Sequence, residues 1–253
     1  MIKMKFQLKV PKKTDYPNSL KILTHSNKLA EYHQVIEASA SAYFETKGPT
    51  KWLFRKRFET VLAYISKIGK VDKLLDAGTG IGFFLPSLSK AANQVVAIDN
   101  TNFSLNYAKF MVKKRKITNV RFKKTKLENL DLKDGQFEVI VCLSVLEHIP
   151  PEKLNQVAYQ FKRVLKPSGS IIVGYPNEGS LLFKLLQQLE RRLFRGHIAK
   201  ALKNKNRIKF QTLGHVATAE QISQMLDKHF TVKKEKTLPF GGINLYKIQW
   251  RSQ

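Results

Sequence analysis

Three glycines at alternate positions stand in the run LLDAGTGIGFF, which extends from Leu74 to Phe84. Asp76 ends the apolar part of the run, and Gly78, Gly80 and Gly82 follow it. Glycine adopts backbone conformations that other residues avoid, and its missing side chain lets main-chain N–H groups approach a ligand closely. The spacing therefore predicts a loop that binds a nucleotide-like cofactor.

The surroundings of this loop strengthen the prediction. A strand-like segment, Val71 to Asp76, precedes the glycines, and a helix-like segment, Phe83 to Ala92, follows them. A second apolar run, Val95 to Ile98, ends in Asp99, 17 residues after Gly82. A carboxylate at the end of such a strand can accept hydrogen bonds from two ribose hydroxyls. Loop and carboxylate together predict a ligand that contains adenosine.

The order of the glycines separates two kinds of cofactor. Dinucleotide sites usually read Gly-x-Gly-x-x-Gly, whereas this series reads Asp-x-Gly-x-Gly-x-Gly from Asp76 to Gly82. It resembles motif I of the class I S-adenosylmethionine-dependent methyltransferases. The segments 128–154 and 161–177 resemble the middle of that superfamily's quinone-methyltransferase-like branch, methyltransferase type 11. The resemblance covers roughly residues 71–177 and implies S-adenosyl-L-methionine as methyl donor, S-adenosyl-L-homocysteine as product, and no metal requirement.

The same resemblance assigns roles on the cofactor side. It places the loop from Gly78 to Gly82 beside the methionine part, Asp99 on the ribose, and the loop from Lys126 to Leu130 beside the adenine. Lys126 stands where many relatives carry an acidic residue, so Leu127 and Glu128 become the candidates for the adenine contact. Asp76 is counted with the cofactor-binding residues, and its alternative role is to brace the glycine loop.

Candidates for the acceptor side follow the fourth predicted strand, since open α/β folds bind ligands at the carboxyl ends of their strands. Ser144 is counted with the cofactor-binding residues, and His148 is a candidate general base because imidazole titrates near neutral pH. A structural role in shaping the loop is the alternative for His148. His215, the second candidate base, lies before a helix whose start is predicted by a capping box of Thr218 and Gln221.

The elements that position these residues alternate along the chain. The hydrophobic patterns predict helices over residues 29–44, 52–68, 83–92, 102–116, 151–165, 181–194 and 219–229, and strands over residues 73–76, 94–99, 120–123, 137–143, 170–174, 231–236 and 244–250. Strands such as VIVCL and IIVG are apolar on both faces, as in a sheet covered by helices on each side. The sequence therefore predicts a doubly wound α/β fold. The resemblance adds that the sheet is mostly parallel, with seven strands and the last one antiparallel.

Length and composition favour one domain. The chain has 253 residues and 43% hydrophobic residues, both ordinary for a single globular enzyme domain. We expect a helical N-terminal cap at 1–70, a cofactor-binding core at 71–177, a basic amphipathic insertion at 178–217, and a C-terminal helix and hairpin at 218–253. The single cysteine, Cys142, lies in a strand-like run and is expected to be a buried thiol. With no membrane-spanning or signal-like stretch recognised, a cytoplasmic location is expected.

The net charge of +26 restricts the partners of the chain. Nine basic residues and no acidic ones lie within 109–126, and nine basic residues with one acidic residue lie within 184–209. In the second segment, leucines share one helical face opposite Lys184, Arg191 and Arg195, which is typical of a basic amphipathic helix. Residues 181–209 are therefore expected to lie on an anionic membrane surface or to form a lid over the site, and the two roles are compatible.

Three functions remain open at this stage. A methyltransferase acting on a small-molecule or lipid-like acceptor is favoured. An RNA methyltransferase is the first alternative, because many lysines bind phosphates without reading sequence. A non-catalytic protein that keeps the fold is the second, although the complete set from Asp76 to Asp99 argues against it. The sequence does not indicate the acceptor, the atom methylated or the oligomeric state.

Overall fold

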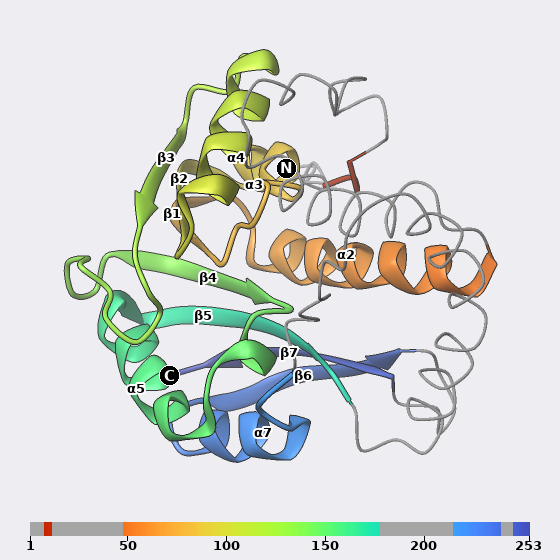
Figure 1. The fold of residues 1–253 in the computed structure, drawn as a ribbon, viewed down its shortest axis with the longest axis vertical. Coiled ribbons are helices and arrows are strands. Elements are labelled where there is room, and N and C mark those ends of the chain that lie inside the picture. Colours follow the sequence, from red (N-terminus) through yellow and green to blue (C-terminus); the bar gives the residue numbers. More distant parts are fainter. Residues whose placement is uncertain (1–7, 12–47, 178–214, 239–244) are drawn as a thin grey trace, which may run out of the picture.

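A computed structural model describes residues 8–11, 48–177, 215–238 and 245–253 (Figure 1). Its centre is a seven-stranded sheet with the strand order β3-β2-β1-β4-β5-β7-β6. Strands β1 to β5 run parallel, whereas β7 pairs antiparallel with both β5 and β6. The mostly parallel, doubly wound α/β sheet of seven strands is thus confirmed, together with its antiparallel last strand.

Most strands extend the predicted segments by a few residues, whereas the predicted strand 137–143 is unchanged and the predicted strand 244–250 lies at 246–252. They are β1 (Val71–Ala77), β2 (Ala92–Asp99), β3 (Val120–Lys124), β4 (Phe137–Leu143), β5 (Leu165–Pro176), β6 (Thr231–Leu238) and β7 (Tyr246–Ser252). The helices are α2 (Gly48–Ile68), α3 (Leu85–Ala91), α4 (Asn102–Lys114), α5 (Pro151–Val164) and α7 (Ala219–Asp227), with a short 3-10 helix, η3 (Leu146–His148). The predicted helices at 29–44 and 181–194 lie outside the described residues.

Helices cover both faces of the sheet, which explains why its central strands are apolar on both sides. Helices α2, α3 and α4 lie on one face, and α5 and α7 lie on the other (Figure 1). Side chains of α2 and α3 pack with β1 and β2 in one hydrophobic cluster, while α5 and α7 pack with β4 and β5 in a second. Each face thereby has its own core, and the carboxyl ends of β1, β2 and β4 are held in one row.

Two local predictions are confirmed. Thr218 accepts a hydrogen bond from the Gln221 backbone N–H at 3.2 Å, and the Thr218 N–H donates to Gln221 Oε1 at 2.9 Å. These two bonds form the capping box that starts α7. Cys142 is fully buried in β4, and burial raises the pKa of its thiol well above the usual range. No helix in the described part of the chain has the length and apolar character needed to cross a membrane.

Candidate functional site

The three loop glycines occupy left-handed conformations, with φ of 84° at Gly78, 53° at Gly80 and 78° at Gly82. Their surroundings differ. A Cβ at Gly78 would lie 2.3 Å from Val145 Cγ2, and a Cβ at Gly82 would lie 2.8 Å from Ala108 Cβ. A Cβ at Gly80 would meet nothing within 4 Å. Gly78 and Gly82 therefore permit close packing, whereas Gly80 faces open space and is the point where a ligand can approach the backbone.

Asp99 is attached to this loop from the end of β2. Its Oδ2 accepts a hydrogen bond from the Gly80 N–H at 3.0 Å. Its Oδ1 accepts from the Thr101 N–H and the Thr101 hydroxyl, each at 3.0 Å. The half-buried carboxylate thus lies beside the open point of the loop, where the sequence placed a ribose. The same bonds order the loop and the start of α4 (Asn102–Lys114).

Asp76 lies beneath the loop and is 6% exposed. Burial raises the pKa of Asp76 to about 7, the nearby Thr79 hydroxyl opposes this rise, and the charge of Asp99 adds to it. Neither Asp76 Oδ2 nor Thr79 Oγ1 meets the geometry of a hydrogen bond to any described residue, and both atoms are buried. Buried oxygens without partners are costly. They form an acceptor pair suited to a cationic N–H group of a bound cofactor.

The residues predicted beside the adenine lie in the connection between β3 and β4. Leu127 is 6% exposed and packs in the core cluster on the side of α5 (Pro151–Val164). Glu128 accepts a hydrogen bond from Lys153 Nζ at 3.2 Å, so its carboxylate is already part of an ion pair. Their role toward the cofactor stays a prediction.

Ser144 follows the last residue of β4 and has a φ of 54°, which is unusual for a residue with a side chain. Its backbone N–H donates to the Gly174 carbonyl at 2.7 Å, and its hydroxyl lies 2.9 Å from the Tyr246 hydroxyl. Arg57 of α2 donates to the Ser144 hydroxyl at 3.4 Å, and its guanidinium lies 4.5 Å from the centre of the Tyr246 ring. Strained residues of this kind cluster at functional sites.

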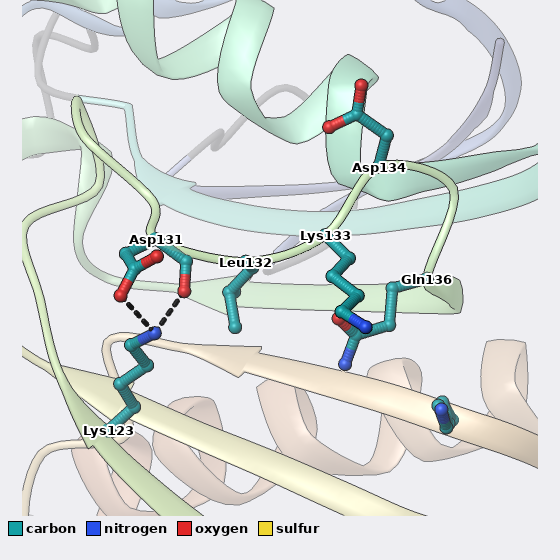
Figure 2. Close-up of a pocket in the computed structure, with 7 residues that line it drawn as sticks. Lys123, Asp131, Leu132, Lys133, Asp134 and Gln136 are labelled. Atoms are coloured by element: carbon teal, nitrogen blue, oxygen red, sulfur yellow. Dashed lines mark hydrogen bonds and ion pairs between the residues drawn. The ribbon is translucent and has the colours of Figure 1, made fainter.

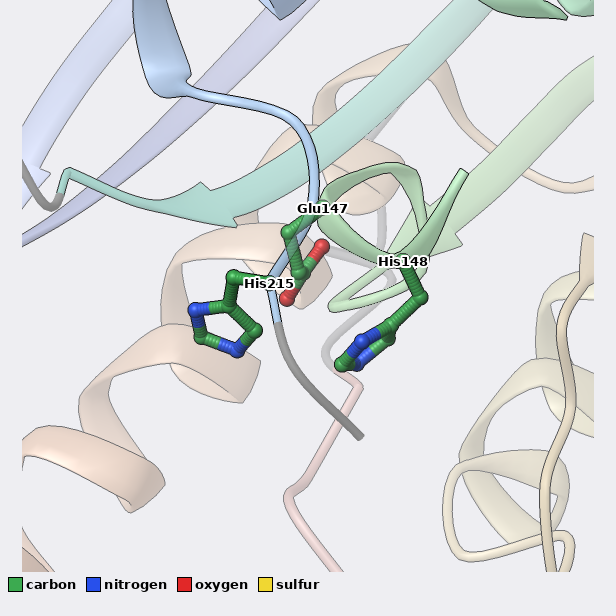
Figure 3. A group of neighbouring side chains, drawn as sticks. All are labelled: Glu147, His148 and His215. Carbon is green, nitrogen blue, oxygen red and sulfur yellow. The ribbon is translucent and has the colours of Figure 1, made fainter. Parts of the chain in front are cut away.

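Glu147 and His148, which follow Ser144 in the chain, come together with His215 (Figure 3). One ligand atom of each side chain lies within 4.8 Å of those of the other two. The imidazole rings of His148 and His215 are 5.1 Å apart between centroids, at 60° to each other. The backbone N–H groups of Val216 and Ala217 donate to the Glu147 carbonyl at 2.8 and 3.2 Å, which fixes the segment that carries His215.

The electrostatics of this group follow from its burial. Glu147 is 2% exposed, and burial raises its pKa to about 7, while its own backbone N–H and the charge of Arg57 act in the opposite direction. Burial, followed by the proximity of His148, lowers the pKa of His215. Both effects favour neutral side chains near pH 7, a carboxylic acid beside a neutral imidazole. The neutral imidazole can accept a proton from an acceptor hydroxyl, and the carboxyl group can bind a metal ion in its ionised form.

A separate hollow of about 680 Å³ lies under the connection that precedes β4 (Figure 2). Its lining residues are Lys73, Lys123, Asp131, Leu132, Lys133, Asp134 and Gln136. Lys123 binds the carboxylate and the carbonyl of Asp131, as Figure 2 shows. Lys73 lies near the amino end of β1 (Val71–Ala77), whereas the glycine loop follows its other end. The hollow is therefore distinct from the predicted cofactor loop.

Sequence reasoning missed several residues of the site. Arg57 is 87 positions from Ser144, and nothing in the local pattern of α2 connects the two. The contribution of Thr79 is visible only once Asp76 is known to be buried beside it. Thr101 gave a local signal, since a threonine directly before a helical pattern is a typical N-cap. The Ser104 N–H does donate to the Thr101 hydroxyl, at 3.2 Å.

Comparison with known families assigns most of the described fold to one protein family. Residues 68–231 match a family model described as "Methyltransferase domain". The match includes the glycine loop, Asp99, Ser144 and the group of Glu147, His148 and His215.

Curated relatives match over a shorter stretch. A ubiquinone biosynthesis O-methyltransferase of Acinetobacter baylyi is 26% identical over 117 residues, which are 45% of this chain and 48% of that protein. An uncharacterized protein of Methanocaldococcus jannaschii is 35% identical over 129 residues, 49% of this chain and 51% of that protein. The sterol 24-C-methyltransferase of Saccharomyces cerevisiae is 28% identical over 119 residues, 46% of this chain and 30% of that protein. The chain thus spans about half the length of the first two of these relatives and less than a third of the sterol methyltransferase.

Solved structures agree in fold. The PH0226 protein of Pyrococcus horikoshii OT3 superimposes with a TM-score of 0.61 at 23% identity, over 88% of this chain and 98% of that one. The N-methyltransferase NodS of Bradyrhizobium japonicum WM9, solved with S-adenosyl-l-homocysteine, gives a TM-score of 0.59 at 16% identity, over 81% of this chain and 88% of that one. At these identities the likeness concerns the fold alone.

Proposed function

We propose that this chain, which belongs to the methyltransferase-domain family, transfers a methyl group from S-adenosyl-L-methionine to a small-molecule or lipid-like acceptor. The observation that carries the proposal is the glycine loop with its two carboxylates. Gly80 offers open backbone, Asp99 lies beside it, and Asp76 keeps a buried oxygen without a partner among the described residues.

The residues fit the donor. S-adenosyl-L-methionine carries an ammonium group and a ribose, and it supplies an activated methyl group when bound. Asp76 Oδ2 and Thr79 Oγ1 are acceptors suited to the ammonium N–H groups, and their lack of a described partner gives that contact a physical reason. Asp99 would accept the ribose hydroxyls. Leu127 and Glu128 are the candidates for the adenine side.

The protein's task in methyl transfer is to hold donor and acceptor in line, close together and away from water. Ser144 follows the carboxyl end of β4 (Phe137–Leu143), and Glu147 and His148 of the three-residue group follow it within four positions, so we place the acceptor there. For a hydroxyl acceptor, His148 or His215 would take the proton as its oxygen attacks the methyl carbon. A neutral imidazole is the form required of that base.

The choice of acceptor class follows the relatives. Those matched include proteins named for ubiquinone biosynthesis and for sterol 24-C methylation, and both names concern apolar small molecules. By that analogy we favour an apolar or lipid-like acceptor, and we keep a cytoplasmic protein at the membrane surface as the accompanying proposal. The basic segment 181–209 would supply the contact with anionic lipid.

Calorimetric titration with S-adenosyl-L-methionine and S-adenosyl-L-homocysteine tests the function. Saturable binding of one equivalent, followed by turnover with an acceptor from a panel of quinols, phenols and sterols, would support it. A folded protein that binds neither compound would refute it and favour the non-catalytic alternative.

A second titration tests whether the basic segment 181–209 binds anionic membrane surfaces. Vesicles with and without anionic lipid are compared at matched salt with a short RNA, using the full chain and a variant lacking residues 181–209. Loss of vesicle binding on deletion, with cofactor binding kept, is the expected result. RNA binding that survives the presence of vesicles would instead favour an RNA methyltransferase.

A further inference from the structure

The group of Glu147, His148 and His215 has the composition of a metal-binding site. It presents one carboxylate and two imidazoles, and the ligand atoms lie within 4.8 Å of one another. Figure 3 shows the three side chains converging from η3 (Leu146–His148) and from the segment before α7. Carboxylate oxygen and imidazole nitrogen are ligands that Zn²⁺ and neighbouring transition metals prefer.

The positions of the ligands are fixed by the backbone. Val216 and Ala217 both donate to the Glu147 carbonyl, so the segment with His215 is attached to the residue that supplies the carboxylate. Ligands about 2.1 Å from one tetrahedral ion lie roughly 3.4 Å apart, so the group would contract by about an ångström on binding. The half-buried ring of His148 and the exposed ring of His215 can make that adjustment by rotation.

An unsatisfied oxygen of Glu147 is a second, independent observation that indicates a bound cation. Glu147 is 2% exposed, and its Oε2 has no hydrogen-bond partner among the described residues. A buried oxygen of this kind is normally satisfied, because leaving it without a partner is costly. The charge of Arg57 is close enough to influence Glu147 but does not provide a hydrogen bond to that oxygen. A bound cation would satisfy it.

We propose that Glu147, His148 and His215 bind one divalent transition-metal ion of the zinc type, which holds an oxygen of the methyl acceptor. Three protein ligands leave a coordination position open, as in catalytic zinc sites. A hydroxyl bound there would give up its proton to solvent water more readily, and its oxygen would attack the methyl carbon as the bond from that carbon to sulfur breaks and S-adenosyl-L-homocysteine leaves. This inference rests on the proposed function and narrows its acceptors to molecules with a hydroxyl group. The two histidines then serve as ligands, and the metal replaces them as the means of activating the acceptor.

Metal titration tests the site without any acceptor. Full-length protein without a histidine tag is stripped with a chelator and titrated with Zn²⁺ by calorimetry and with Co²⁺ by visible absorption. One equivalent should bind, with a Co²⁺ spectrum typical of mixed nitrogen and oxygen ligands. Glu147→Gln and His215→Ala should each weaken binding by more than the roughly 10- to 100-fold that loss of an outer-shell partner costs.

His229→Ala is the matched control, because His229 lies beyond the end of α7, outside the group, and its substitution should leave metal binding unchanged. Should Glu147→Gln fail to fold, His215→Ala carries the test, since its ring is exposed. Absence of saturable binding, or equal binding by wild type and His215→Ala, would overturn the site. S-adenosyl-L-homocysteine affinity measured on the same samples separates this failure from failure of the proposed function.

Discussion

Replacement of Asp99 by alanine is the most direct test of the cofactor site. A carboxylate offers about four lone-pair positions, and three of them are occupied by Gly80 N–H, Thr101 N–H and the Thr101 hydroxyl. The Thr101 hydroxyl also lies 2.8 Å from the Ser104 hydroxyl, to which it can donate instead. Asp99 can therefore accept two ribose hydroxyls while it keeps both backbone bonds.

The magnitude follows from those two bonds. A hydrogen bond to a charged group contributes about 1.5–3 kcal/mol, so two contribute about 3–6 kcal/mol. Since about 1.4 kcal/mol corresponds to a tenfold change in affinity, Asp99→Ala should weaken S-adenosyl-L-homocysteine binding by roughly 10²- to 10⁴-fold. Calorimetry measures the dissociation constant, and thermal unfolding without ligand reports the separate cost of loosening the loop.

Two controls make the result specific to the ribose. Asp72→Ala removes an exposed carboxylate at the amino end of β1, where its one described hydrogen bond is with Asn93, and it should leave affinity unchanged. An adenosine analogue without ribose hydroxyls should bind wild type more weakly than adenosine, but the two should bind Asp99→Ala equally. Unchanged S-adenosyl-L-homocysteine affinity in a folded Asp99→Ala protein would refute the ribose assignment.

Three further predictions concern the same region. In Gly80→Ala the new methyl group would lie in the open space left for the ligand, so cofactor binding should weaken, and the left-handed backbone should cost about 1–2 kcal/mol of stability. In Gly82→Ala the new Cβ would lie only 2.8 Å from Ala108 Cβ, so this variant should chiefly lower the melting temperature. The pKa of Asp76 is about 7 in the free protein, above its ordinary value of 3.8, so the contribution of Asp76 to the free energy of unfolding should decline as pH rises from about 4 to about 7. A bound ammonium group favours the ionised carboxylate, so cofactor affinity should rise over pH 6–8. An affinity that does not change with pH, as in Asp76→Asn, would contradict this. Thr218→Ala should cost about 0.5–2 kcal/mol in urea unfolding by loss of the N-cap of α7, with cofactor affinity retained.

The fold could be predicted because its signals are local. Strands such as β4 (Phe137–Leu143) are apolar on both faces, and alternation with helical patterns leaves few arrangements for a covered parallel sheet. The ends of the strands were less accurate. β5 begins at Leu165 rather than at residue 170, because Phe137 pairs with Leu165 before a register shift. A ladder of backbone hydrogen bonds extends into polar residues that no hydrophobic pattern marks.

The residues of the site could also be predicted where the signal lies within one element, and could not where it depends on contacts between elements. The glycine loop was visible because a positive φ is a property of single residues, and Gly78, Gly80 and Gly82 all have one. The pairing of His148 with His215 was not visible, since 67 positions separate them and the contact depends on two backbone bonds to Glu147. Patterns within one element predict that element, but they do not report which side chains from different elements meet.

One short segment connects the two halves of the site. Val145 occupies the space that a side chain at Gly78 would need, so the cofactor loop packs directly on the residue after Ser144. Two residues further on, Glu147 holds the segment of His215 through its carbonyl. The cofactor loop and the residues proposed to hold the acceptor therefore pack on one short segment, residues 144–147, which explains how both halves of the site are positioned together.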